Sequence, residues 1–270
     1  MKQLFTLMAA FFLLKNTSFA QADSSFQYLK SVKGDIASFA VDHLDNLYLI
    51  GSTDQLKKIN ANGDSVAVFN NVRKFGKISY IDVSNPLRVL LYYKDFSTIV
   101  VLDRLLNVRN TIDLRKQNIF QVRAIGLSYD NMIWLYDELE NRLKKIDEEG
   151  KLIFETNDFR QLFDDAPVPV RIFDQDGFVY LYDKSGGVFV FDYYGALKNK
   201  ILITGWDNFK VTGKSFFGNV KDTLFRYRID LFRVYDYKLP PALSGFRSMD
   251  FTSARFYGLR QNEVEIYLLK

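Results

Sequence analysis

The fold is decided by residues 125–150, which read IGLSYDNMIWLYDELENRLKKIDEEG. Short runs of alternating or continuous apolar residues predict three strands, at 125–127, 132–136 and 143–146. The polar pair Asp130-Asn131 supplies the turn between the first two strands, and the run DEEG supplies the turn after the third. Two hairpins in tandem therefore predict an antiparallel meander.

The same phrase occurs twice more, as FAVDHLDNLYLIGSTDQLKKINANG at 39–63 and as RIFDQDGFVYLYDKSGGVFVFDYYG at 171–195. An apolar-acidic step, or its asparagine equivalent, ends each predicted third strand and recurs at intervals of about 43 to 45 residues. It is found at Ile59-Asn60, Leu102-Asp103, Ile146-Asp147, Phe191-Asp192 and Tyr235-Asp236. A repeat of this length with several short strands is typical of β-propeller blades, whereas strand solenoids use shorter units.

We therefore predict an all-β fold, a six-bladed β-propeller with four-stranded antiparallel blades. The predicted blades span 35–71, 72–117, 118–165, 166–207, 208–243 and 244–270, the last completed by 25–33. This N-terminal strand would close the ring by covering the free edge of the C-terminal blade. In the fifth blade Pro240-Pro241 occupy the position expected for the outer strand, which predicts a short fourth strand there. One helical turn is expected at 158–163.

The N-terminus has the pattern of a secretory signal peptide. An apolar run at 4–14 follows Met1-Lys2, and Ala20-Gln21-Ala22 fits the small-x-small cleavage rule. The run is too short to cross a hydrocarbon core of ~30 Å, although an N-terminal membrane anchor is the alternative interpretation. We predict a signal peptide at 1–22 and a single propeller domain at 23–270. The domain would be exported to the periplasm, the cell surface or the extracellular medium. The chain has no cysteine, so neither a lipid-modified cysteine nor a disulfide is available.

The charge balance argues against a polyanion partner. The formal charge of the chain is +4, and removal of Lys2 and Lys15 with the signal peptide leaves about +2 with both signs interspersed. We therefore expect no nucleic acid and no transmembrane segment in the mature chain. The expected partner is another envelope or secreted protein, bound by a monomer that carries no cofactor.

Residues 41–63 and 127–150 resemble the NHL repeat. In the second segment the residues that match its pattern in order are Asp130-Asn131, Trp134, Asp137, Arg142, Ile146-Asp147 and Gly150, with the asparagine displaced to Asn141. The match is good in three blades and loose in the other three. The resemblance implies a six-bladed propeller of the NHL-like (TolB-like) superfamily, of the secreted bacterial type. This fold hosts many functions, so it does not specify one.

The resemblance also implies two kinds of enzyme, and the sequence shows whether the residues that each would need are present. A zinc site would need several histidines, and the one histidine, His43, falls in a predicted hairpin turn. Calcium lactonases of related propellers gather Glu, Asn and Asp side chains around the central channel. The candidates near the inner strands are Asp35, Asp82, Asp174, Asn219 and Asp250, for which we favour the alternative role of capping turns and strand ends. No nucleophile motif of the G-x-S-x-G kind and no phosphate loop occurs.

Basic and aromatic residues near the predicted starts of the inner strands suggest a binding surface. The basic residues are Lys77, Arg123, Arg171, Lys214 and Arg247. A ring of these cations would hold an anionic ligand or an acidic partner segment, although basic side chains also commonly just solvate a rim. The aromatic residues are Phe75, Phe120, Trp206, Phe209 and Phe246. We expect Phe120 and Phe209 to be core and Trp206 to be exposed.

The hypothesis with most support is a non-catalytic binding or scaffold protein that uses one face of the propeller. That face would carry Arg73, Lys74, Lys77, Arg123, Arg171, Trp206, Lys214 and Arg247, with Asp137, Glu138, Arg142 and Lys184 from the hairpins. Aromatic and arginine side chains at a rim are the usual composition of binding hot spots. The alternatives are a calcium-dependent hydrolase or lactonase with carboxylates in the channel, and a carbohydrate-binding propeller that uses exposed aromatic residues.

Overall fold

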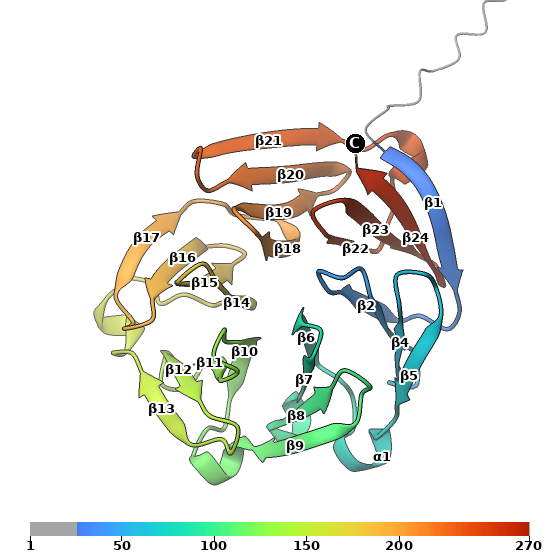
Figure 1. The fold of residues 1–270 in the computed structure, drawn as a ribbon. Coiled ribbons are helices and arrows are strands. Elements are labelled where there is room, and N and C mark those ends of the chain that lie inside the picture. Colours follow the sequence, from blue (N-terminus) through green and yellow to red (C-terminus); the bar gives the residue numbers. More distant parts are fainter. Residues whose placement is uncertain (1–25, 270) are drawn as a thin grey trace, which may run out of the picture.

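The computed structural model describes residues 26–269, which form a ring of six four-stranded antiparallel sheets (Figure 1). The predicted six-bladed propeller is therefore confirmed. The predicted signal peptide at 1–22 lies outside the described residues. Between 26 and 269, no helix has the length and apolar character that crossing a bilayer requires.

Each blade is a meander whose first strand is the innermost. Blade 1 contains β2 (Ser38–Val41), β3 (Leu47–Ile50), β4 (Leu56–Ile59) and β5 (Ser65–Phe69). Blade 2 contains β6 (Tyr80–Asn85), β7 (Arg88–Tyr93), β8 (Thr98–Asp103) and β9 (Val108–Asp113). Blade 3 contains β10 (Val122–Leu127), β11 (Ile133–Asp137), β12 (Arg142–Ile146) and β13 (Leu152–Glu155).

The second half of the ring repeats this order. Blade 4 contains β14 (Arg171–Gln175), β15 (Phe178–Asp183), β16 (Gly187–Asp192) and β17 (Leu197–Ile201). Blade 5 contains β18 (Asp207–Thr212), β19 (Ser215–Val220), β20 (Thr223–Arg228) and β21 (Arg233–Lys238). Blade 6 contains β22 (Ser248–Phe251), β23 (Arg255–Arg260), β24 (Glu263–Leu269) and the N-terminal strand β1 (Phe26–Lys33).

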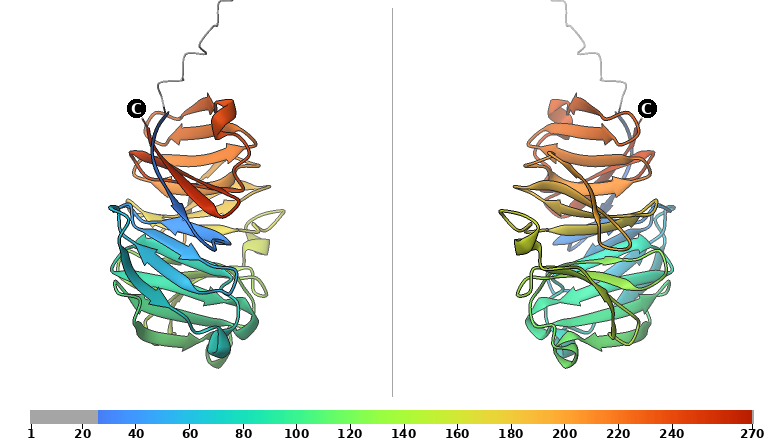
Figure 2. Two further views of the ribbon diagram at one scale, coloured as in Figure 1. Left: turned by 90° about the vertical axis from the view of Figure 1, so that its right-hand side faces the viewer. Right: turned by 90° about the vertical axis from the view of Figure 1, so that its left-hand side faces the viewer.

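The two faces of the ring carry different connections. We call the face at which the inner strands begin the inlet face, because it carries the connections between blades and the hairpins between second and third strands. The opposite, outlet face carries the other hairpins. The described part of the chain contains five short helical turns, all on the inlet side: α1 (Val72–Phe75), η1 (Lys94–Phe96), η2 (Leu114–Gln117), η3 (Phe159–Gln161) and η4 (Pro241–Leu243). The turn η3 was predicted, and Figure 2 shows the yellow-green segment that contains it projecting from the disc.

The acidic residue of the repeat caps the turn that follows the third strand. Oδ1 of Asp147 accepts hydrogen bonds from the backbone N–H groups of Glu149 (3.0 Å) and Lys151 (2.8 Å). Asp103 and Asp192 make the same pair of bonds two and four residues ahead. These bonds also hold the pKa of Asp103 below its ordinary value, the N–H of Asn107 contributing most. The repeat seen in the sequence is thus a repeat of side-chain-capped turns.

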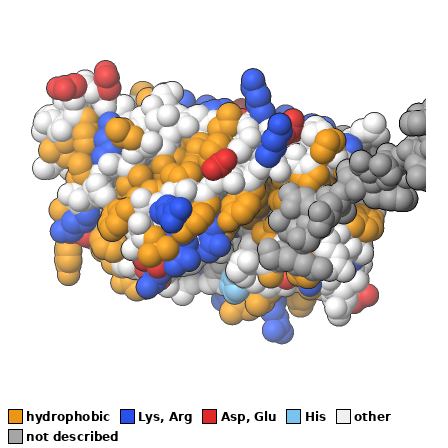
Figure 3. Space-filling view, turned by 90° about the horizontal axis from the view of Figure 1, so that it is seen from above, with side chains coloured by type: hydrophobic (Ala, Val, Ile, Leu, Met, Phe, Trp, Pro, Cys, Tyr) orange, Lys and Arg blue, Asp and Glu red, His pale blue; other side chains and the backbone are white. Residues whose placement is uncertain are grey.

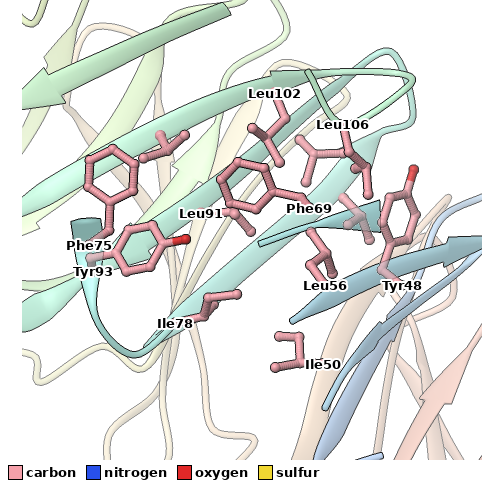
Figure 4. Packing of buried hydrophobic residues seen from close by; sticks show 13 residues of the cluster. Tyr48, Ile50, Leu56, Phe69, Phe75, Ile78, Leu91, Tyr93, Leu102 and Leu106 are labelled. Carbon is pink, nitrogen blue, oxygen red and sulfur yellow. The ribbon is translucent and has the colours of Figure 1, made fainter. Parts of the chain in front are cut away.

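The hydrophobic core is divided among the spaces between neighbouring blades. Between blades 1 and 2, for example, Tyr48 and Leu56 of one sheet pack against Leu91 and Leu102 of the next (Figure 4). Phe75 and Ile78, from the connection between the two blades, complete this cluster. Because inner and middle strands are covered on both sides, they read as continuous apolar runs rather than as alternating ones.

The ring closes through β1, as predicted. This strand pairs antiparallel with β24, from Phe26 opposite Leu269 to Lys33 opposite Glu263. Figure 1 shows the blue N-terminal strand lying beside the red C-terminal one. Phe26 also makes an edge-to-face contact with Phe256 of the same blade, with ring centroids 5.9 Å apart. The free edge of the last sheet is therefore covered.

Blade 5 differs from its prediction in two respects. Its outer strand β21 is six residues long and ends before Pro240, so the prolines follow the strand instead of shortening it. Tyr235-Asp236 lies inside this outer strand, and the third strand ends earlier, at Arg228. The regular interval up to Asp236 was therefore assigned to the wrong strand, although the number of blades is correct.

The outer strands mix apolar and charged side chains along their exposed edges. Strand β21 reads RVYDYK, and Val234 and Tyr237 are exposed between charged neighbours. Figure 3 shows this side of the ring, with hydrophobic side chains interrupted by lysine and arginine. Charges on an unpaired edge oppose strand-to-strand association with other chains.

Candidate functional site

A cavity of about 580 Å³ occupies the central channel of the ring. Residues of five inner strands line it, from β2, β6, β14, β18 and β22. Strand β10 contributes no lining residue because it packs closely against β14: a Cβ at Gly126 would stand 2.7 Å from the carbonyl oxygen of Ile172. A volume of this size falls in the range of small-molecule sites, about 300–1,000 Å³.

Two carboxylates in the channel hold neighbouring blades together. Oδ2 of Asp82 accepts a hydrogen bond from the backbone N–H of Leu127 at 2.8 Å, and Oδ2 of Asp250 accepts one from Val41 at 2.8 Å. Their other oxygens accept from Ser84 N–H and from the Lys210 ammonium, respectively. Each carboxylate therefore links its own inner strand to that of the next blade.

Asp174 links blade 4 back to blade 3. Its Oδ2 accepts hydrogen bonds from the Ser128 hydroxyl at 2.7 Å and the Trp134 indole N–H at 2.9 Å, and weakly from the Tyr129 N–H. Its Oδ1 accepts from the Tyr193 hydroxyl at 2.6 Å. Both oxygens are committed to the protein, which is the capping role favoured from the sequence.

The remaining candidates for a calcium set lie away from the channel lining. Asp35 accepts hydrogen bonds from the N–H and hydroxyl of Ser52 in a hairpin on the inlet face. Asn219 lies on the second strand β19 rather than on an inner strand, where its amide bonds Asn208. Among residues 26–269, no three acidic or histidine side chains converge as a metal ligand set. His43 is exposed at the channel wall, in the predicted turn.

The five basic residues that were expected to ring the inlet do not converge. Lys214 lies in the hairpin after β18, at the outlet face, because β18 begins earlier than predicted. Arg123 pairs with Glu138 at 2.6 Å, and Arg247 donates to the carbonyl oxygen of Ile36 at 2.9 Å. Arg73 is exposed on α1, and Lys77 is exposed two residues after it. Of the predicted set, Arg171 alone lines the channel.

Arg171 reaches from blade 4 to blade 2. Its guanidinium carbon lies 4.7 Å from the centroid of the Tyr80 ring, on β6. Both side chains are half-buried. Burial raises the pKa of the Tyr80 hydroxyl above its ordinary value, and the guanidinium partly opposes this shift. The stacked pair narrows the inlet half of the channel.

Lys210 is a channel cation that the sequence analysis missed. Its ammonium donates to Oδ1 of Asp250 at 2.7 Å and to the carbonyl oxygen of Val41 at 2.8 Å. It thereby ties together blades 5, 6 and 1. The available signal was a lysine between the two apolar residues of the inner strand DNFKVT. A search for residues that precede strands cannot find it.

The aromatic residues of the connections also differ from expectation. Trp206 is buried, with 7% of its surface exposed, and its ring stacks on Phe225 at 5.3 Å. Phe120, expected in the core, is 56% exposed. Phe209 is core, as predicted. Phe246 packs edge-to-face on Phe256 at 5.5 Å. Trp206 is internal because the chain turns inward after Gly205, which adopts a positive φ of 76°.

The charged residues assigned to the hairpins of this face are mostly paired. Asp137 is buried and binds the Lys144 ammonium at 2.8 Å, so it is not a surface residue. Arg142 pairs with Glu155 at 2.6 Å, and Lys184 with Asp207 at 2.5 Å. Lys74 is exposed and covers the Phe75 ring.

A set of exposed apolar side chains, not foreseen from the sequence, lies on the inlet face. We call it the apolar rim, and its members are Phe96, Phe120, Leu139, Leu162, Val168, Val170 and Leu202. All seven come from the loops of blades 2 to 4 and from the connection that follows blade 4. Leu202 is 79% exposed.

Backbone hydrogen bonds hold the loops of the apolar rim to neighbouring hairpins. The N–H of Phe159 donates to Asn141 at 2.9 Å, and that of Gly205 to Lys184 at 2.7 Å. The N–H of Val168 donates to the Asp183 carboxylate at 2.8 Å. These loops are thus fixed to the scaffold, and the rim is presented on an ordered surface.

Comparison with known proteins supports the propeller fold but assigns no family or function. No protein-family profile matches the chain, and no curated protein matches it. Among solved structures it is similar to a streptogramin B lyase, at 15% identity and a TM-score of 0.58 over 86% of this chain and 78% of that one. It is also similar to virginiamycin B lyase from Staphylococcus aureus, at 11% identity and a TM-score of 0.62 over 91% and 100%. The WD40 domain of Pan2 from Neurospora crassa aligns at 8% identity with a TM-score of 0.60 over 90% and 95%. Such identities show a shared propeller fold alone.

Proposed function

We propose that this chain is a non-catalytic binding protein of the bacterial cell envelope, which holds a protein partner on its inlet face. The apolar rim carries this proposal. Within the described residues, the large apolar side chains that are exposed in the loops of this face all belong to it. The outlet hairpins also expose apolar side chains, but these are spread over five blades, whereas the rim is confined to neighbouring loops. Exposed apolar groups gathered in neighbouring loops are typical of protein interaction sites.

The setting of the rim favours a protein over a small molecule. Its members spread over the loops of three neighbouring blades, and charged pairs such as Arg123 with Glu138 lie beside them. Apolar anchors with a polar surround are the usual anatomy of an interface. Because hydrogen bonds already order the loops, binding would cost little conformational entropy.

The channel carboxylates support binding rather than hydrolysis. A calcium-dependent lactonase needs carboxylate oxygens directed at the ion. The carboxylate oxygens of Asp82 and Asp250, which line the channel, are directed at N–H and ammonium groups of the protein itself. Those of Asp174, which does not line it, are directed at O–H and N–H groups. Their hydrogen bonds join neighbouring blades, which is a structural role.

The test of the partner surface compares two double variants. In the rim variant, Phe120→Ser and Leu202→Ser remove two exposed anchors. In the control, Leu105→Ser and Tyr194→Ser remove two equally exposed side chains from the outlet face. Each protein is immobilised, and proteins retained from native envelope extract are quantified by mass spectrometry.

We expect the native protein and the control to retain the same partner, and the rim variant to lose it, since a true anchor contributes about 2 kcal/mol or more. All three proteins should keep the same circular dichroism. Equal retention by the rim variant would remove the proposal for this face, and loss by the control alone would move the site to the outlet face.

Export is tested separately. The N-terminal pattern of Lys2, an apolar run and Ala20-Gln21-Ala22 supports processing before Asp23. N-terminal sequencing of protein recovered from the periplasm or the culture medium should therefore begin at Asp23. Recovery of chains that still begin at Met1, in the membrane fraction, would instead favour an N-terminal anchor.

A further inference from the structure

We infer that the inlet half of the channel binds a small organic anion, whose carboxylate or phosphate group pairs with the guanidinium of Arg171. The inference is independent of the apolar rim and of any protein partner. It rests on the environment of Arg171, on the polar groups at the same end of the channel, and on the mixed lining of the cavity.

Arg171 is a channel cation without a counter-charge of its own. Within the described part of the chain, its side chain makes no hydrogen bond and no ion pair. Lys210, by contrast, has both Asp250 and a carbonyl oxygen. A half-buried guanidinium loses part of its hydration, and pairing with an anion would recover that free energy. An anion in the channel would supply the pair.

The Tyr80 ring prepares the guanidinium for this role. Contact with the ring at 4.7 Å restrains the guanidinium, and within residues 26–269 its N–H groups donate to no other residue. An arginine held in this way can present two parallel N–H groups to a carboxylate or phosphate, which a lysine cannot. Because the orientation is already restrained, less conformational entropy is lost on binding.

Hydroxyl groups stand at the same end of the channel. Ser38 is the first residue of β2, and Ser79 directly precedes Tyr80 at the start of β6; both line the cavity. The Ser79 oxygen accepts a hydrogen bond from the Lys94 N–H, so its own proton remains available to a ligand. Such donors would complete the coordination of an anionic group.

The other charges of the channel lie further along the strands. The charges of Asp82 and Asp250 both help to raise the pKa of Tyr80. Asp82 is held by two backbone N–H groups, and Asp250 by Lys210. Counting Arg171, the lining therefore carries two basic side chains and two carboxylates besides His43. No strong general field attracts anions, so the affinity should come from the local contact with Arg171 and should be modest.

The lining also has an apolar component. Ile81 and Phe173 border the same cavity, each half-buried. A ligand that buries a small apolar body against them while its anionic group meets Arg171 would use both kinds of surface. Simple inorganic anions would use only one of the two.

The experiment titrates benzoate, benzamide and inorganic phosphate into the purified mature chain at low ionic strength, followed by isothermal calorimetry. Benzoate should bind saturably, and benzamide, its neutral isostere, should not. Stronger binding by inorganic phosphate than by benzoate would show that the apolar lining contributes nothing, and would contradict an organic ligand. Absence of saturable binding by both anions, or equal binding of benzoate and benzamide, would overturn the inference without any variant.

Variants then locate the site. Arg171→Gln should weaken anion binding by about tenfold or more, since a charge-assisted pair is lost, and Arg171→Lys should restore it only in part. Arg123→Gln, which removes an arginine of the inlet face that already has a carboxylate, should leave binding unchanged. Unchanged binding by Arg171→Gln, with unchanged circular dichroism, would place the anion elsewhere and contradict the inference.

Discussion

Two regions of the molecule, the packed interfaces between blades and the inlet side of the ring, use the same kinds of side chain differently. In the interfaces these side chains are buried and partnered, and on the inlet side they are unpaired or exposed. Asp174 and Arg171 lie on one strand, yet Asp174 receives hydrogen bonds from three side chains. The Arg171 guanidinium lies over an aromatic ring and makes no ion pair with the described residues. Trp206 and Phe120 both occupy connections between blades, yet one is stacked inside and the other is exposed. The role of each residue depends on what the neighbouring blade offers it, and not on its type.

The largest difference is expected between the two aromatic residues. Trp206→Ala should lower the free energy of unfolding by about 3–5 kcal/mol, since it empties a packed site against Phe225. Phe120→Ala should change it by less than about 0.5 kcal/mol, because the ring is exposed. Urea unfolding followed by circular dichroism measures both. Similar losses for the two variants would mean that Phe120 also belongs to the interior.

A somewhat smaller loss is expected at Asp174. Asp174→Ala removes the acceptor of the Trp134 indole and the Ser128 and Tyr193 hydroxyls, and should cost about 3 kcal/mol. Asp164→Ala, in an exposed loop, is the matched control and should unfold with the native protein. If thermal melting finds Asp174→Ala as stable as the control, the hydrogen bonds of Asp174 are not what joins blades 3 and 4.

The interior should also make the protein sensitive to alkali. Burial raises the pKa of Tyr92, Tyr180 and Tyr182 to about 12, whereas an unfolded tyrosine ionises near pH ~10. Above that pH the unfolded state binds fewer protons than the folded state, so stability is complete below pH ~10 and falls as the pH rises toward 12. Urea midpoints across this window test the sign, and Tyr182→Phe should reduce the slope. A midpoint that is constant or rises would contradict it.

The smallest effects concern the two channel cations. Lys210→Gln leaves Asp250 without its ammonium and should cost about 1 kcal/mol, a value lowered by the partial exposure of both groups. Arg171→Gln should not reduce stability, because no ion pair is lost. Differential scanning calorimetry compares the two. A larger loss for Arg171→Gln than for Lys210→Gln would assign Arg171 to the structure and weaken its assignment as an anion site.

The fold could be predicted because its determinants are local. The capped turns at Asp103, Asp147 and Asp192 are each formed within a few residues. They therefore recur in the sequence as a regular pattern, which we call the trace. Blade 5 shows the limit of this reasoning. Its third strand lacks such a capped turn, since the Asp230 carboxylate that follows it pairs instead with Arg228, and the trace was assigned to the outer strand.

The site could not be predicted in the same way. Lys210 is defined by Val41 and Asp250, and Arg171 by Tyr80, so the relevant partners are brought together only when the ring closes. Exposure is equally non-local, as Trp206 and Phe120 show. Choosing the basic residues near the predicted starts of the inner strands found Arg171, but also four residues that do not line the channel.

The pairing of β1 with β24 has a consequence for the order in which the molecule can assemble. During synthesis β1 is the first of the described strands to be made, but its only sheet neighbour, β24, is the last. Contacts between such distant segments raise the contact order and slow folding. An unfinished chain can form separate blades, but it cannot close the ring. Until synthesis is complete, β1 lacks the strand with which it pairs, and its unpaired backbone groups would be available to chaperones.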